Sequence, residues 1–195
     1  MVEIGSAIFT YLKISFRKIL PLAALFFSFA SAAQDLPQSK PGKMMIEVLH
    51  ADDLYDQVES RTGRRLARLL GNVSFRHKEV YMLCDSAHFY PGSNQIKAYS
   101  RIHMHQGDTL HLKGDSLFYD GATELASVDG NVELIDKETH LYTESVKYDV
   151  ANDIARYSTG GRIINGENTL TSIIGIYYVK DNLFHFKDSV NIVNP

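Results

Sequence analysis

A repeat with a step of 29 to 30 residues is the feature that most constrains the fold of this chain. Each clear copy holds a small residue, an acid and a serine, and an aromatic residue follows three positions after the serine. These copies occupy residues 84–89, 114–119 and 143–148, and a diverged fourth copy covers 173–178. A fixed period in this range indicates an architecture of stacked repeat units, each one a small supersecondary structure.

The rest of each unit keeps the same order. A turn follows the aromatic residue, and then comes an aliphatic residue with a large apolar residue three positions further on. The next strand is predicted to start at Gly71-Asn72-Val73 in one unit and at Gly130-Asn131-Val132 in another. The last such start, at Val190, runs directly into Pro195, so we expect the array to be truncated or to continue beyond the C-terminus.

Within the units the hydrophobic period is two. Val73 and Phe75 alternate with Ser74 and Arg76, which is typical of strands with one apolar and one polar face. Short polar turns such as residues 106–108 and 136–138 separate the strands and favour an antiparallel, all-β arrangement.

The alternation changes phase once in every unit. Leu112 and Gly114 share one parity, whereas the next apolar residues, Leu117 and Tyr119, have the other. A phase change inside a strand requires a bulge or a corner that keeps apolar side chains facing inward. We therefore predict that each unit bends at its acid-serine motif and that the stacked units make a bent, V-shaped two-sheet β-jellyroll.

The apolar residues of both halves should face one continuous interior, which is the candidate binding site for a lipid chain. Burial of each methylene in such a groove stabilises a complex by about 0.8 kcal/mol. The alternative, a packed core without a ligand, uses the same residues. The predicted lining consists of Val73, Phe75, Phe89, Ile96, Ile102, Leu112, Leu117, Tyr119, Leu125, Val132, Leu134, Leu141, Val146, Tyr148, Ile154, Ile163, Ile173, Ile176, Tyr178 and Leu183.

The N-terminal segment has the pattern of an export signal. Basic residues at 13, 17 and 18 precede an apolar run from 19 to 30, and Ala30-Ser31-Ala32 is an A-x-A cleavage pattern. We interpret residues 1–33 as a cleavable signal peptide, 34–43 as a linker and 44–195 as the folded domain. An uncleaved membrane anchor is the alternative, although the run is short for a span of about 20 residues.

Residues 52–70 allow two interpretations. Arginines among leucines could form a charged helix. However, residues 51–55 resemble the acid-aromatic motif, and Leu66 precedes Gly71 by the same interval that separates Leu125 from Gly130. We therefore favour a degenerate first repeat.

Motifs for chemistry are few. His103 and His105 would share a strand face, as two metal ligands should, but that face is the polar one, and we predict no metal site and no cofactor. Asp85, Asp115 and Glu144 recur once per repeat, whereas an active site needs one convergent cluster, so we expect these acids to support the bends through hydrogen bonds to backbone N–H groups.

Two further observations exclude other classes. The lone cysteine, Cys84, cannot form an internal disulfide and suits a small buried position. The net charge is −3, and removal of residues 1–33 makes it −5, which argues against a nucleic-acid partner. We predict a protein that is not an enzyme.

The acid-aromatic motifs at 114–119 and 143–148, with the Gly-Asn-Val segments at Gly71 and Gly130 and the export signal, resemble the OstA-like family. That family includes the periplasmic lipopolysaccharide-transport proteins LptA and LptC and the N-terminal domain of LptD. The resemblance covers about Met45 to the end and implies a bent β-jellyroll whose interior shelters the lipid A acyl chains of lipopolysaccharide. It implies a location in the periplasm, either free there or associated with the outer membrane. It also implies end-to-end strand pairing with like domains that bridges the inner to the outer membrane.

The chain is therefore expected to bind and transport lipopolysaccharide in the periplasm. The alternative is a structural or adhesive exported β-repeat module with a closed core and no lipid ligand. The diverged fourth copy, where Ile173-Ile174-Gly175 replaces the acid-serine motif, departs from the family pattern and leaves the bend of the last unit open.

Overall fold

The computed structural model describes residues 44–194, which form one antiparallel sheet of 14 strands. The all-β, repeat-built prediction is confirmed. No helix of these residues is long and apolar enough to cross a membrane. The strands are β1 Glu47–His50, β2 Asp53–Val58, β3 Arg65–His77, β4 Val80–Tyr90, β5 Gln95–Gln106, β6 Leu110–Asp120, β7 Leu125–Asp136, β8 Thr139–Asp149, β9 Ile154–Tyr157, β10 Gly161–Asn165, β11 Asn168–Ser172, β12 Ile174–Tyr178, β13 Leu183–Lys187 and β14 Asn191–Val193.

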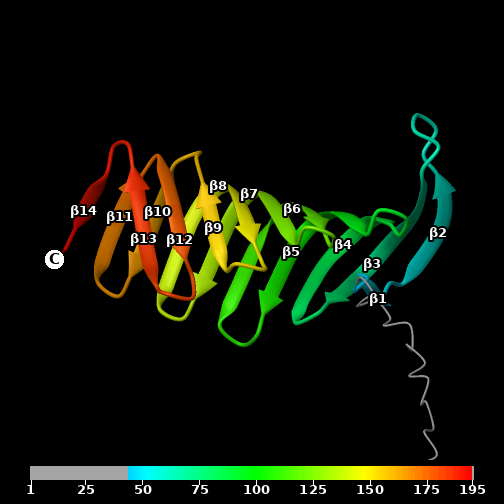
Figure 1. The fold of residues 1–195 in the computed structure, drawn as a ribbon, viewed down its shortest axis with the longest axis horizontal. Helices are drawn as coiled ribbons and strands as arrows, with labels where there is room; N and C mark the ends of the chain where they lie inside the picture. The colour runs from blue at the N-terminus through cyan, green and yellow to red at the C-terminus, as the bar shows by residue number, and fades with distance from the viewer. Residues whose placement is uncertain (1–43, 195) are drawn as a thin grey trace, which may run out of the picture. The chain divides into compact units, whose positions relative to one another are not determined.

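Neighbouring strands in the sequence are neighbours in the sheet. From β3 to β8 each strand pairs with the next, β1 and β2 both pair with β3, and beyond β8 the sheet divides between β10-β11-β14 and β9-β12-β13. Figure 1 shows this stack running from β1 and β2 at one end to β14 at the other. Each repeat is therefore one hairpin, and each hairpin buries its apolar face only when the next is stacked beside it.

The six long strands β3 to β8 bend in the middle, at a line of bulges that we call the corner. In β3, Gly71 and Asn72 stand opposite the single residue Asp85 of β4, and both have positive φ, 74° and 47°. The same left-handed pair recurs at Ser100-Arg101 in β5 and at Gly130-Asn131 in β7. Two consecutive left-handed residues turn the strand without ending it.

The repeated acids hold these pairs in place. The Asp115 carboxylate accepts a 2.7 Å hydrogen bond from Asn131 Nδ2, and Asp85 accepts one of 2.5 Å from Ser100 Oγ and one of 2.7 Å from Arg101 Nε. The predicted support of the bend is thus present at Asp85 and Asp115, but its donors are side chains of the left-handed pair and not the expected backbone N–H groups. Among residues 44–194, Glu144 makes no such bond.

The corner corrects the predicted strand starts. Gly71-Asn72 and Gly130-Asn131 lie inside β3 and β7, not at their beginnings. In sequence a left-handed Gly-Asn pair resembles a turn, but here the chain bends at the pair and continues into the second half of the same strand.

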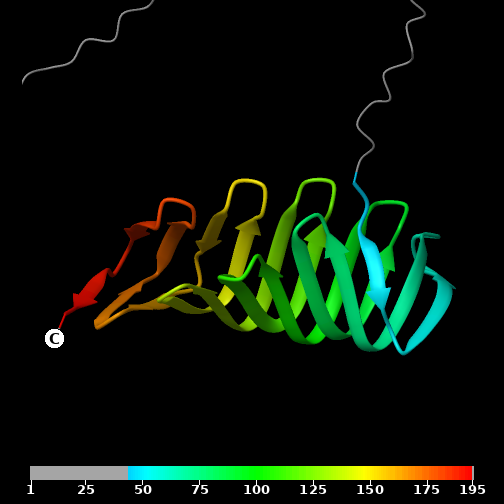
Figure 2. The same ribbon diagram turned by 90° about the horizontal axis from the view of Figure 1, so that it is seen from below.

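The corner divides the sheet into two walls that fold over one another (Figure 2). Wall A comprises residues 73–84, 102–114, 132–143 and 161–172 with β1 and β14. Wall B comprises residues 65–70, 86–99, 116–129, 145–157 and 174–187 with β2. Apolar side chains from both walls form one hydrophobic core that runs the length of the stack.

Both ends of the array differ from the middle. At the N-terminal end, residues 53–58 and 65–77 are strands, so the degenerate first repeat is confirmed, and Asp52 bonds Asn72 at 2.9 Å as Asp115 bonds Asn131. At the other end, β9 and β10 are separate strands, as are β11 and β12, because strand pairing is interrupted at the corner. The segments predicted as signal peptide and linker, 1–33 and 34–43, lie outside the described residues.

Candidate functional site: the apolar interior and its mouth

The space between the two walls is the site that the sequence predicts, and most of the predicted lining does face it. Tyr119, Leu134, Leu141 and Val146 have no side-chain surface open to water. The buried predicted residues are Val73, Phe75, Ile96, Ile102, Leu112, Leu117, Tyr119, Val132, Leu134, Leu141, Val146, Tyr148 and Ile163, whereas Phe89, Ile154, Ile176 and Tyr178 are half-buried.

Six predicted lining residues are wrong. Strand register places Ile154, Ile176 and Tyr178 on the outer face of wall B, one residue away from the inward-facing Ala155 and Tyr177. The other three are exposed. Leu125, Ile173 and Leu183 are exposed by 47%, 46% and 47% of their surface. Leu125 and Val128 are three residues apart, and residues three apart on a strand point to opposite faces. The inward neighbours are Ala126 and Val128, at 2% and 0% exposure.

The last repeat is out of phase by one residue with respect to the sequence alignment. Strand register aligns Tyr119, Tyr148 and Tyr177 in one row that crosses wall B, so Tyr177 and not Tyr178 occupies the interior position. Tyr177 is 1% exposed. The diverged motif therefore spans 172–177, and Ile173 lies at the corner between β11 and β12.

Several residues that face the interior are absent from the lining predicted from the sequence. Ala87, Ala98, Ala126 and Ala155 lie on the inner face of wall B and are at most 2% exposed. Alanine is too small and too common to mark a face by itself. For Ala87 and Ala98, the signal that could have identified them is their place in the alternation, two residues from the predicted interior residues Phe89 and Ile96.

Opposite the corner, the free edges of the two walls meet along a line that we call the mouth. The row of interior tyrosines in wall B ends here. Their hydroxyls reach three side chains beside the hairpins of wall A: Tyr119 to His77 Nδ1 at 2.7 Å, Tyr148 to Gln106 Oε1 at 3.1 Å, and Tyr177 to Asp136 Oδ2 at 2.7 Å. These partners were missed from sequence, although they recur at steps of 29 and 30 residues.

Each mouth bond joins a tyrosine to a hairpin 41 or 42 residues earlier, and therefore links two neighbouring repeats. Burial is the main reason why the pKa values of Tyr119, Tyr148 and Tyr177 lie well above the ordinary value of tyrosine. The three hydroxyls stay protonated and can donate their hydrogen bonds at any physiological pH.

Further polar contacts cross the same line. Lys78 and Glu124 form an ion pair, and Gln106 Nε2 donates to Asp153 Oδ1 at 3.4 Å. At the first repeat the residues before β1 cover the mouth: the Ile46 N–H donates to Asn94 Oδ1 at 2.8 Å, and the Met44 carbonyl lies 3.0 Å from His77 Nε2. In this structure the interior is closed from the corner to the mouth.

The interior can therefore bind an apolar ligand only if the two walls move apart at the mouth. The inner face is aliphatic and aromatic, while the polar groups at its edge already satisfy one another. A long acyl chain would replace contacts between the walls by contacts with each wall.

The other candidate groups lie outside the interior. His103 Nε2 and His111 Nδ1 are 3.1 Å apart on the outer face of wall A, with the His105 ring centroid 5.6 Å from that of His103. Burial and the two neighbouring imidazoles lower the pKa of His103. Among residues 44–194 no group of three or more histidines, cysteines or acids is arranged to hold a metal ion. Cys84 is buried, as predicted.

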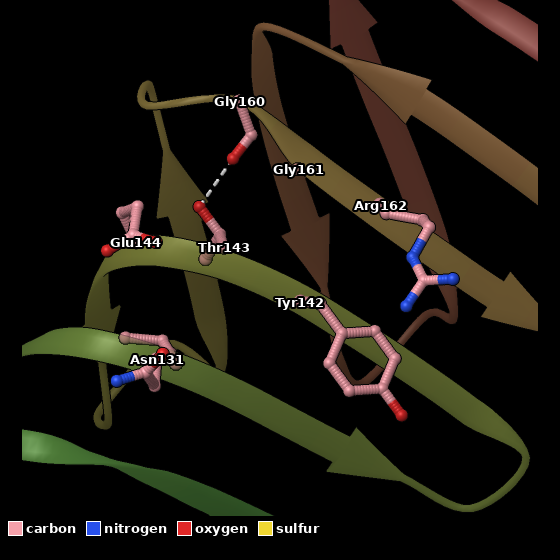
Figure 3. A pocket seen from close by; sticks show the side chains of 8 residues that line it. Asn131, Tyr142, Thr143, Glu144, Gly160, Gly161 and Arg162 are labelled. Atoms are coloured by element: carbon pink, nitrogen blue, oxygen red, sulfur yellow. Dashed lines mark hydrogen bonds between the residues drawn. The ribbon is translucent and has the colours of Figure 1, made fainter.

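A depression of about 450 Å³ marks the last corner (Figure 3). Here Thr143 Oγ1 donates a 2.6 Å hydrogen bond to the Gly160 carbonyl, and the Arg162 guanidinium lies over the Tyr142 ring, 5.0 Å from its centroid. The Thr143 bond ties β8 to the residue before β10 at this corner. Polar and apolar groups both line this depression, whereas the interior is apolar.

Comparison with known proteins agrees with this architecture. No curated protein matches the chain. Among solved structures, the chain is similar to LptH from Pseudomonas aeruginosa, described as the LptA homologous periplasmic component of the conserved lipopolysaccharide transport device, with a TM-score of 0.55 and 15% sequence identity over 60% of this chain and 94% of that one. This likeness shows a shared fold. The family model described as OstA-like protein matches residues 43–195, and the chain therefore belongs to the OstA-like family.

Proposed function

We propose that residues 44–195 are a periplasmic domain that binds and transports lipopolysaccharide, sheltering its acyl chains in the apolar interior. The observation that carries this proposal is the continuity of the core, which extends from Leu69 in β3 to Tyr177 in β12 without a polar layer across it. Membership of the OstA-like family and the printed description of LptH support it.

The mechanism is passive. The walls separate at the mouth, the tyrosine hydroxyls exchange their partners for water, and acyl chains lie along the inner faces while sugars and phosphates stay outside. Each lost mouth bond costs about 0.5–1.5 kcal/mol, whereas each buried methylene of the ligand returns about 0.8 kcal/mol. A few methylenes per repeat therefore offset the opening, and no covalent step is required.

Passage between membranes would use both ends of the stack. Among the strands that the structure describes, β14 pairs with β11 only and β2 pairs with β3 only, so each of them has an edge that a strand of a like domain can join. An export signal in residues 1–33 would deliver the domain to the periplasm. Such pairing would align successive interiors into one path from the inner to the outer membrane.

A photocrosslinking amino acid at Leu117 or Val146 tests the proposal. Both side chains are buried in the interior, at 3% and 0% exposure. Incubation with lipopolysaccharide should give a crosslinked adduct at these positions and none at Lys137, an exposed residue of the β7-β8 turn. Crosslinking at Lys137 alone would contradict the proposal that acyl chains bind in the interior.

A structural or adhesive module with a permanently closed core is the second candidate, and the closed mouth favours it. Lys78→Cys and Glu124→Cys, in a Cys84→Ser background, place two thiols at the ion pair that spans the mouth. Under the first proposal a cleavable thiol crosslinker between them abolishes adduct formation at Val146, and cleavage restores it. A module that never opens gives no adduct in either state.

A further inference from the structure

The residues before β1 form a short segment that crosses the mouth, and we call residues 44–46 the latch. The latch extends from β1, which pairs with β3 in wall A, to the β4-β5 turn of wall B. There the Ile46 N–H donates a 2.8 Å hydrogen bond to Asn94 Oδ1, and Asn94 Nδ2 donates one of 3.4 Å to the Met44 carbonyl. Asn94 is 2% exposed, so its side chain is committed to the latch. The latch therefore ties one wall to the other.

A second contact links the latch to the row of mouth tyrosines. The Met44 carbonyl lies 3.0 Å from His77 Nε2, and because a carbonyl only accepts hydrogen bonds, Nε2 carries the proton of this bond. In this tautomer the other ring nitrogen, Nδ1, accepts the 2.7 Å bond from the Tyr119 hydroxyl. The latch, His77 and Tyr119 thus form one chain of hydrogen bonds across the mouth, and release of the latch removes its first member.

The side chain of Ile46 lies inside the domain. It is 4% exposed and belongs to the hydrophobic core between the walls. The β6-β7 turn packs closely on it, since a Cβ at Gly121 would lie 3.0 Å from Ile46 Cδ1. Ile46 therefore occupies apolar space beside the mouth, and the methylene groups of a ligand can fill that space once the latch is withdrawn.

The latch closes the mouth at a place where later repeats use a hairpin. Asn94, Glu124 and Asp153 share one place in the wall B turns, with positive φ of 56°, 58° and 55°. Glu124 pairs with Lys78, and Asp153 accepts a 3.4 Å bond from Gln106, and both partners belong to wall A hairpins. Asn94 has the latch as its partner instead. At this position the closure therefore depends on one extended segment and not on a paired hairpin.

The strand that carries the latch is weakly held. β1 has four residues, all of them exposed, and its pairing with β3 is irregular between Val48 and His50. Its ion pair with β3, between Glu47 and Arg76, is exposed at both side chains, and such pairs contribute little to stability. Short, exposed edge segments open locally at a much lower free energy than core strands do. The latch can therefore lift while β3 to β8 stay folded.

We propose that the latch is an autoinhibitory gate. While it is closed, Ile46 fills part of the interior at this end of the stack and the mouth is tied shut, and an acyl chain enters here only after the latch lifts. This gate rests on the proposed function, because it regulates access to the same interior. Ligand and latch compete, so the apparent affinity for the ligand is the intrinsic affinity multiplied by the fraction of molecules whose latch is open.

The first test measures lifting of the latch without a ligand. It uses residues 41–195, which form one compact unit with its own core, and places a thiol by Val80→Cys in a Cys84→Ser background. Val80 is 2% exposed and pairs with His77, so this thiol reports on the mouth beside the latch. Ile46→Ala should speed its labelling by a disulfide reagent about tenfold or more. Asn94→Gly, which keeps the positive φ of the turn and removes the side-chain partner of the latch, should speed it roughly threefold or more.

Controls distinguish local lifting from a general loss of stability. Ile163→Ala makes the same change at an equally buried residue, 4% exposed, toward the other end of wall A, and should leave the labelling rate within about twofold of the parent in dilute urea. Because lifting exposes little surface, the faster labelling of Ile46→Ala should show almost no dependence on urea well below the unfolding midpoint. An unchanged rate for Ile46→Ala, or a gain that Ile163→Ala shares, would overturn the proposal.

The second test adds lipopolysaccharide. With a photocrosslinking amino acid at Leu117, the initial rate of adduct formation should rise in Ile46→Ala and in Asn94→Gly by about the same factors as thiol labelling. Faster labelling with an unchanged rate of adduct formation would overturn the gating role of the latch. No adduct in any variant, the parent included, would refute the proposed function, and the thiol rates would still show whether the latch lifts. Far-UV circular dichroism of each variant checks that the sheet is intact.

Discussion

The Tyr177 hydroxyl donates a 2.7 Å hydrogen bond to Asp136 Oδ2, although the two residues are 41 positions apart and belong to different walls. Both are buried, at 1% and 3% exposure. The bond is the last of the series that starts at Tyr119 and His77. Its removal by mutation would show how much closure of the mouth contributes to the stability of the fold.

Tyr177→Phe keeps the ring and removes this donor, which leaves a buried carboxylate without it. We expect the free energy of unfolding in urea to fall by about 1–3 kcal/mol. Tyr55→Phe is the control, because Tyr55 is 50% exposed on β2, and its change should lie within about 0.5 kcal/mol of zero. A loss for Tyr177→Phe no larger than that of the control would show that the mouth bond does not stabilise the closed fold.

Gly130 is required at the corner for two reasons. Its φ is 80°, and a Cβ would lie 2.5 Å from Asp115 Oδ2. Gly166 also has positive φ, 57°, but open space surrounds its Cβ position. Gly130→Ala should therefore cost more than the ~1–2 kcal/mol of left-handed backbone alone, which Gly166→Ala should approach. Thermal unfolding of the two variants compares them, and equal losses would mean that Asp115 moves aside freely.

Asp85 makes the corner sensitive to acid. Hydrogen bonds from Arg101 and Ser100 hold the pKa of its carboxyl below the ordinary value of ~3.9. Because the folded pKa is the lower one, this contribution is present above pH ~3.9 and is lost as the pH falls through the folded value.

The urea midpoint of Asp85→Asn should accordingly lie below that of the parent at pH 6, and the difference should shrink as the pH is lowered below about 4. Asp108→Asn, in the exposed β5-β6 turn, provides the comparison. A difference between parent and Asp85→Asn that stays constant with pH would refute the electrostatic role of Asp85.

Cys84 should be an unreactive thiol in the folded protein. Burial raises its pKa to about 11, and its side chain is 6% exposed. Because only the thiolate reacts, we expect labelling by a disulfide reagent at pH 8 to be slower by about two orders of magnitude than in urea-unfolded protein. Comparable rates in the two states would mean that wall A opens readily at this residue.

The repeat period and the alternation of apolar residues predict the antiparallel sheet, its bends and 13 of the interior positions, because each of these depends on local periodicity. The phase at the strand ends was not predictable in the same way. Leu125 and Ile154 are apolar residues that follow a turn, and only the pairing of Leu125 with Asp120 and Asp149 shows which face they occupy.

The contacts across the mouth could not be predicted from local sequence patterns, for a different reason. His77, Gln106 and Asp136 share no chemistry as residue types, and only their distance from the repeated tyrosines reveals a common role. The contacts also join one repeat to the hairpin of the preceding repeat, and strand pairing does not fix that offset between the walls.

That offset has a mechanical consequence. Because each mouth bond joins two neighbouring repeats, no repeat in the middle of the stack can open alone without loosening the next one. Separation of the walls therefore begins most easily at an end of the stack, where a repeat has only one neighbour. It then proceeds along the axis of the stack, one repeat after another. A long, flexible ligand would accordingly thread in lengthwise from an end, and would not be admitted from the side.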